Sequence, residues 1–187
     1  MENPKKVLPL QGKSLMMNPQ YQQISDENTS VVNEALQGYA RTIAPTPMSP
    51  PKPTAMNNTN FFNNKMLIIR TIRHGLPFSI FQKIKNSAPF TDEDWARYLN
   101  VSSKTLQRHR KEAQYHFKPI HTEKIIELAE VTQLGVEVFD SQDQFYSWLH
   151  TPSYALGQYK PAELLKDSYG KELVMAELYR IDQGIFA

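Results

Sequence analysis

Residues 102–111, SSKTLQRHRK, carry side chains that suit contact with DNA. Ser, Thr, Gln and Arg can hydrogen-bond to base edges in the major groove, and Lys and Arg can neutralise phosphates. In a helix with Leu106 on its inner face, the other side chains of this segment point largely outward. The candidate DNA-contacting residues are Ser102, Ser103, Lys104, Thr105, Gln107, Arg108, Arg110 and Lys111. The alternative is a helix used only for packing, with RHRK as a solvated face.

The surrounding segment, TDEDWARYLNVSSKTLQRHRKEA, has the spacing of a helix-turn-helix. Ala96 is the small residue needed where two steeply crossed helices approach each other, and Leu99 and Val101 are apolar residues on either side of the turn. Asn100 occupies the turn position often held by Gly, and Asn tolerates left-handed backbone angles better than most residues. The segment therefore predicts a DNA-binding helix-turn-helix, although such cores are sometimes reused for protein contacts.

Other kinds of chemistry find little support in the sequence. The five histidines do not converge at metal-ligand spacing: His74, His109, His116, His121 and His150. There is no cysteine, and no phosphate-binding loop, nucleophile elbow or H-E-x-x-H motif occurs. The carboxylates of the C-terminal third stand singly, as solvated charges do. We expect neither an enzyme nor a metal-binding or cofactor-binding protein.

The charge of the chain is unevenly distributed. The formal net charge of +2 combines +7 over residues 63–121 with −6 over residues 122–187. A basic segment followed by an acidic one indicates two surfaces with different partners, unless the charges fall unevenly by chance. The longest apolar runs, MLII and VEVF, are too short to span a membrane, and the N-terminus lacks a signal-peptide core. We expect a soluble cytoplasmic protein.

The pattern of residues divides the chain into three segments. Residues 1–60 are polar, with five prolines between positions 45 and 53, and are predicted to form a disordered arm. Within it, residues 29–43 have near-helical apolar spacing, for which a fluctuating turn is favoured over a docking helix. Residues 61–121 are predicted to hold the helix-turn-helix domain, and residues 122–187 a C-terminal helical region. The fold class is all-α, because GVEVF is too short to establish a sheet.

Helix boundaries follow from caps and stop signals. Gly75 is predicted to end one helix, and Thr91, Thr122 and Ser141 to cap three others. The expected helices span 64–75, 77–87, 91–99, 102–116, 122–134, 141–150, 161–168 and 169–184.

The loop TPSYALGQYK, residues 151–160, is stiff and carries large side chains. Pro152 and Pro161 restrict the backbone, so that ordering Tyr154 and Leu156 against a partner costs less entropy. Gly157 permits a close approach of two backbones. Contact with a partner is the favoured interpretation, and a tight turn that only stacks the last helices is the alternative.

The C-terminal region resembles that of the Xre/MbcA/ParS-type antitoxins. The shared pattern is Trp-Leu, Pro, Ala-Leu-Gly, Pro, Leu-Leu, Gly, Leu, Arg-Ile and a closing Gly-hydrophobic pair. It is met by Trp148, Leu149, Pro152, Ala155, Leu156, Gly157, Pro161, Leu164, Leu165, Gly170, Leu178, Arg180, Ile181, Gly184 and Ile185. The helix-turn-helix precedes it in the expected order, so the resemblance covers roughly residues 63–187. Two departures, at Ser153-Tyr154 and Gln158-Tyr159, bear on which toxin would be recognised.

The resemblance implies the antitoxin of a type II toxin–antitoxin system. Such antitoxins bind a RES-domain toxin that attacks NAD and cover its active-site entrance with their C-terminal region. They also bind their own promoter DNA through an Xre-like helix-turn-helix, usually as dimers or within the toxin complex. The toxin-binding residues expected on this basis are Pro152, Tyr154, Leu156, Gly157, Arg180, Gly184, Ile185 and Phe186.

Some roles stay open from the sequence. Arg180 could instead pair with Glu177 or Glu172 or cap the last carbonyls, and Ile185 and Phe186 could serve a dimer interface. The alternative function is a stand-alone transcriptional regulator whose C-terminal region only dimerises. A third possibility is a protein-only adaptor, which would show no salt-dependent affinity for DNA.

Overall fold

The computed structural model describes residues 19–43, 60–112 and 114–185. Every regular element within these residues is a helix, apart from an isolated antiparallel bridge between Pro77 and His116. The all-α prediction is therefore confirmed for this part of the chain. None of its helices is long and apolar enough to cross a membrane.

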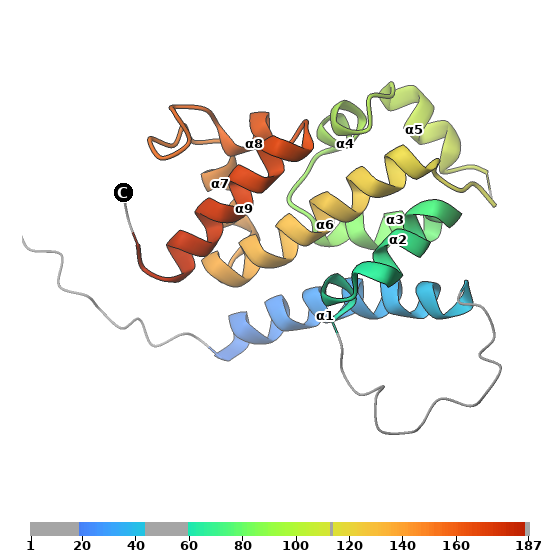
Figure 1. The fold of residues 1–187 in the computed structure, drawn as a ribbon, viewed down its shortest axis with the longest axis horizontal. Coiled ribbons are helices and arrows are strands. Elements are labelled where there is room, and N and C mark those ends of the chain that lie inside the picture. Colours follow the sequence, from blue (N-terminus) through green and yellow to red (C-terminus); the bar gives the residue numbers. More distant parts are fainter. Residues whose placement is uncertain (1–18, 44–59, 113, 186–187) are drawn as a thin grey trace, which may run out of the picture.

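A central helix, α6 (Pro119–Phe139), runs through the molecule and packs against most other helices. On one side of it lie α1 (Pro19–Thr42), a short 3-10 helix η2 (Phe61–Asn63), α2 (Lys65–His74) and α3 (Phe78–Ser87). The helices α7 (Gln142–Leu149) and α9 (Ser168–Asp182) also pack against α6, and the short α8 (Pro161–Leu164) packs against both of them. The pair α4 (Asp92–Tyr98) and α5 (Ser103–His109) lies at the N-terminal end of α6 (Figure 1).

The helix α1 is the largest departure from the sequence-based expectation. A disordered arm was expected over residues 1–60, but residues 19–42 form a 24-residue helix. Leu36 and Ala40 are 0% and 1% exposed in the core. Asn33 accepts a hydrogen bond from the backbone of Phe61, and the Tyr39 hydroxyl donates one to the carbonyl of Gly75. Packing against α2, α3 and α6 stabilises a helix that is weakly encoded locally. The rest of the expected arm lies outside the described residues.

Two helices of the predicted helix-turn-helix domain and the segment after it begin or end elsewhere than expected. The helix α5 ends at His109, whereas a helix to residue 116 was expected. The following chain turns back, and Phe117 donates a backbone hydrogen bond to Leu76. The helix α6 begins at Pro119, so Thr122 is not its cap. The Thr122 hydroxyl is buried in the first turn instead, where it accepts a hydrogen bond from the backbone of Leu76 and donates one to Phe117.

The expected caps of the other helices are confirmed. Gly75 ends α2 with φ of 81°. Thr91 and Asp94 form a reciprocal capping box at the start of α4, and Ser141 caps α7 through the backbone N–H of Gln144.

Aromatic rings fill the core around the helix-turn-helix. The ring of Trp95, 0% exposed, meets the edges of Phe81 and Phe90, and Phe81 in turn contacts Phe117. These contacts join α3, α4 and the segment before α6, so the position of α4 and α5 is set by residues far apart in the sequence.

Candidate functional site

The α4–α5 pair has the geometry of a helix-turn-helix. Ala96, Leu99 and Leu106 are buried, at 4%, 2% and 5% exposure, as predicted. Asn100 adopts the left-handed conformation, with φ of 51°. The backbone N–H of Val101 donates to the carbonyl of Ala96 at 2.9 Å, which closes the turn.

The outer face of α5 brings most of the predicted DNA-contacting residues together. A shallow surface hollow is lined by Ser102, Lys104, Thr105, Gln107, Arg108 and Lys111. Ser103 and Arg110, the other two predicted residues, do not line it. The hydroxyl of Ser102 caps α5 and lies 2.8 Å from that of Thr105, so both hydroxyls already have partners. Lys104, Gln107 and Arg108 are therefore the better candidates for new contacts.

The cations on this face are available to an anionic partner. Among the described residues, Lys104, Arg110 and Lys111 form no ion pair, and all three are exposed. Arg108 pairs with Glu112 at 3.6 Å, but both side chains are exposed, and such pairs are weak. A phosphate can therefore compete for Arg108.

An aromatic contact joins the end of α5 to the segment before α6. The ring of His109 stacks on Tyr115 at a centroid distance of 3.6 Å.

Burial, together with Lys118 and His109, lowers the pKa of His121, which keeps its ring neutral near pH 7. His121 therefore adds no charge to the basic surface at that pH.

The loop between α7 and α8 is tightly folded around Ser153. The backbone N–H of Ser153 donates to Tyr159, and its carbonyl accepts from Leu156 and Gln158 at 3.2 and 2.8 Å. Gly157 and Gln158 have φ of 66° and 67°. A Cβ at Gly157 would meet only the Tyr159 ring, at 3.8 Å, so its backbone angle is what favours glycine there.

This loop presents only some of the expected contact residues. Tyr154 is 82% exposed and Pro152 is exposed beside it. Leu156 was expected to contact a partner, but its side chain is 7% exposed and belongs to the hydrophobic core. The loop bends its Leu inward, which anchors the loop and leaves Tyr154 at the surface.

The end of α9 forms a Schellman motif. Gly184, with φ of 70°, donates to the carbonyl of Ile181, and Ile185 donates to that of Arg180. Arg180 pairs with Glu177 at 2.8 Å, one of the alternatives expected for it. Ile185 is 54% exposed. Phe186 lies outside the described residues.

Sequence reasoning missed three exposed apolar residues on α9. Tyr169, Leu173 and Tyr179 are 83%, 55% and 51% exposed. Their spacing was the available signal, because a helix that buries Val174 and Leu178 turns all three away from the core.

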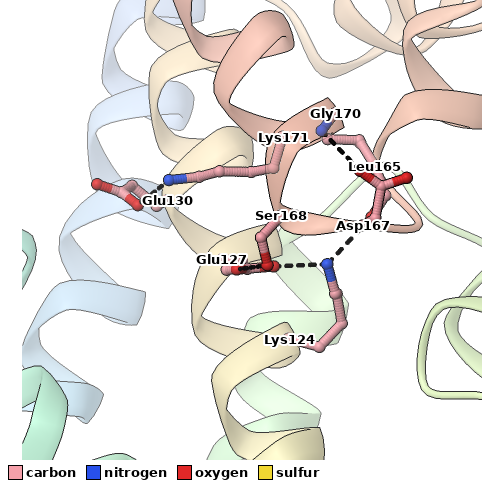
Figure 2. A network of polar contacts seen from close by, with 8 residues as sticks. All are labelled: Lys124, Glu127, Glu130, Leu165, Asp167, Ser168, Gly170 and Lys171. Atoms are coloured by element: carbon pink, nitrogen blue, oxygen red, sulfur yellow. Dashed lines mark hydrogen bonds and ion pairs between the residues drawn. The ribbon is translucent and has the colours of Figure 1, made fainter.

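A polar network fastens the C-terminal helices to α6 (Figure 2). The ammonium of Lys124 pairs with Glu127 at 2.5 Å, and Glu127 accepts a hydrogen bond from the Ser168 hydroxyl at 2.7 Å. Lys171 pairs with Glu130 at 2.6 Å. Asp167 caps α9 through the backbone N–H of Gly170. The start of α9 is thereby held in place along α6.

A buried hydrogen bond links the helix-turn-helix directly to the C-terminal region. The hydroxyl of Tyr98, in α4, donates to the carbonyl of Ala162, in α8, at 3.0 Å. Burial raises the pKa of Tyr98, with a further contribution from Asp94, so this hydroxyl keeps its proton.

No group of His, Cys, Asp and Glu side chains able to hold a metal ion occurs among the described residues.

Comparison with protein families finds two matches in the chain. Residues 67–130 match the antitoxin Xre-like helix-turn-helix domain, and residues 134–184 match the antitoxin Xre/MbcA/ParS C-terminal toxin-binding domain. Together the two matches span more than half of the chain. The chain belongs to the Xre/MbcA/ParS-type antitoxins. A search of curated proteins found no match.

The α5 hollow lies in one family match, and the loop with Tyr154 lies in the other. The hollow on α5 lies in the DNA-binding part, and the loop with Tyr154 and all of α9 lie in the toxin-binding part. The matches meet at residues 130–134, inside α6. The helix α1 lies outside both matches, although it contributes to the same core.

Proposed function

We propose that this type II antitoxin neutralises a RES-domain toxin that attacks NAD, and that it represses its own promoter. In this proposal it acts by binding and not by catalysis. The toxin's active-site entrance is covered by the C-terminal region, while α5 reads the operator. A complex that binds its own promoter is a cytoplasmic complex. A homodimer would have the two-fold symmetry of a palindromic operator.

The observation that carries the toxin-binding part is the pre-ordered loop of residues 151–160. Its backbone hydrogen bonds and the buried Leu156 fix it before any partner binds, and Tyr154 stands almost fully exposed at its tip. A rigid aromatic anchor loses little conformational entropy on binding. Such a loop suits insertion into the mouth of a cleft.

The test for the toxin is co-expression of the full-length antitoxin with the adjacent open reading frame. We expect the neighbour's product to stop growth alone, and the antitoxin to restore growth and to co-purify with it. Tyr154→Ala should weaken the complex by about 30-fold, as expected for a central anchor. Ile120→Ala, at a 71% exposed position on α6, is the control and should leave both the rescue of growth and the affinity for the toxin unchanged. A harmless neighbour that does not co-purify would favour the stand-alone regulator.

The test for DNA uses the cations of α5 and the turn that follows it. Replacing Lys104 and Lys111 with Ala should weaken binding to the promoter, because fewer phosphates are neutralised. The slope of log affinity against log salt should fall in magnitude by about 0.9 for each phosphate that is no longer neutralised. Lys160→Ala and Lys166→Ala remove exposed lysines of the toxin-binding part and should leave the slope unchanged. An unchanged slope for the Lys104 and Lys111 variants would place the DNA surface elsewhere or nowhere.

A further inference from the structure

The outer face of α9 carries large side chains that the fold does not use. Tyr169 and Leu173 are 83% and 55% exposed, and the helical repeat aligns them with the exposed Ala176 and Arg180. Positions i, i+4, i+7 and i+11 lie along one line of a helix. We refer to Tyr169, Leu173, Ala176 and Arg180 as the α9 stripe.

The core of the protein is complete without the α9 stripe. The opposite face of α9 buries Val174 and Leu178 fully, and Lys171 fastens the helix to α6. Arg180 is held at the surface by its ion pair with Glu177, whose carboxylate is buried. An exposed Tyr, a Leu and an oriented Arg along one line are the residues expected of an interface, because aromatic and Arg side chains are enriched among those that dominate binding energy.

We propose that the α9 stripe is the surface that holds the toxin, as distinct from the loop that covers its active site. This rests on the proposed function. All four residues lie within 134–184, the part that matches a toxin-binding domain. Of the four, only Arg180 was expected from the sequence to contact the toxin.

The charge around the α9 stripe indicates the chemistry of the partner. The exposed carboxylate of Glu172 borders the stripe, and residues 122–187 carry a net charge of −6. The complementary surface is an apolar groove that accepts Tyr169 and Leu173, rimmed by Lys or Arg. A second copy of this chain would bring the same acidic region against itself, which disfavours it as the occupant.

The experiment measures the affinity of the purified antitoxin for the product of the adjacent open reading frame, made inactive by mutation so that it can be expressed. Leu173→Asp places a charge in the middle of the α9 stripe and should weaken binding by about 30-fold or more. Tyr169→Ala is the second variant, because Ala favours the helix and an unfolded protein cannot explain its effect. Met66→Asp, at a 58% exposed position on α2, is the matched control and should bind normally. Promoter binding by all three variants should remain unchanged.

Each other outcome has a distinct meaning. If the unmodified antitoxin does not bind the neighbour's product, the proposed function fails and the stripe loses its partner. If it binds but Leu173→Asp and Tyr169→Ala bind equally well, the stripe proposal alone is wrong. If the two variants turn a dimer into a monomer in light scattering and keep their toxin affinity, the stripe joins two copies of the chain and the proposal is overturned.

Discussion

At the scale of single residues, two glycines show how differently the same residue type is used. A Cβ on Gly170 would lie 1.9 Å from the carbonyl oxygen of Leu164, at the point where α8 and α9 meet. A Cβ on Gly38, in α1, would have nothing within 4 Å. Gly170 is therefore required by a close backbone approach, whereas Gly38 only weakens its helix.

Gly170→Ala should lower the free energy of unfolding by about 3 kcal/mol, since backbone atoms would have to move. Gly38→Ala should raise it by up to about 1 kcal/mol, because Ala is the better helix former. Urea denaturation followed by circular dichroism measures both changes. Equal stability of Gly170→Ala and the unmodified protein would contradict the packing of α8 against α9.

At the scale of elements, α1 is a helix whose existence depends on its partners. Its sequence from Pro19 to Thr42 is largely polar, so the helix has little tendency to form alone. Leu36 and Ala40 nevertheless enter the core between α3 and α6. The helix thus adds to a domain whose family match begins only at residue 67.

Leu36→Ala should lower the free energy of unfolding by about 2–5 kcal/mol, the range for a fully buried Leu. Val31→Ala, on the same helix but 44% exposed, should change it by less than about 0.5 kcal/mol. Thermal unfolding of both variants at one pH compares them directly. Two variants of equal stability would mean that α1 does not pack as described.

At the scale of the whole molecule, the DNA-binding and toxin-binding parts share one helix. Both family matches include part of α6, and the hydrogen bond from Tyr98 to Ala162 connects them a second time. Figure 1 shows α6 passing from the α4–α5 pair to the α7–α9 group without interruption. We therefore expect the two parts to unfold together in one transition.

The chain has two tryptophans, Trp95 in α4 and Trp148 in α7, and each reports on one part. Tyr98→Phe leaves the carbonyl of Ala162 without this partner and should lower stability by about 1–2 kcal/mol. We would introduce Tyr98→Phe separately into the Trp95→Phe and the Trp148→Phe proteins. The midpoint of unfolding, followed by the fluorescence of the remaining tryptophan, should shift by the same amount in each. A shift seen by Trp95 but not by Trp148 would show that the parts unfold independently.

Much of the helix-turn-helix was predictable because its determinants are local. The capping box of Thr91, the left-handed turn at Asn100 and the inward face of Leu106 each depend on residues within one or two turns. The end of α2 at Gly75 is of the same kind. The split of charge and the antitoxin pattern could likewise be read directly from the order of residues.

Features that depend on distant partners could only be seen in the tertiary structure. The sequence does not show which core α1 enters, that the chain after His109 turns back to Leu76, or that Leu156 points inward. The spacing on α9 indicates that Tyr169 and Leu173 face away from Val174 and Leu178, but only the packing on α6 shows that no other described segment covers them. Sequence by itself determined the ends at Gly75, Thr91 and Ser141, the turn at Asn100 and the family, since these depend on neighbouring residues. Tertiary packing decided burial, because a side chain is buried or exposed only relative to segments far from it in the chain.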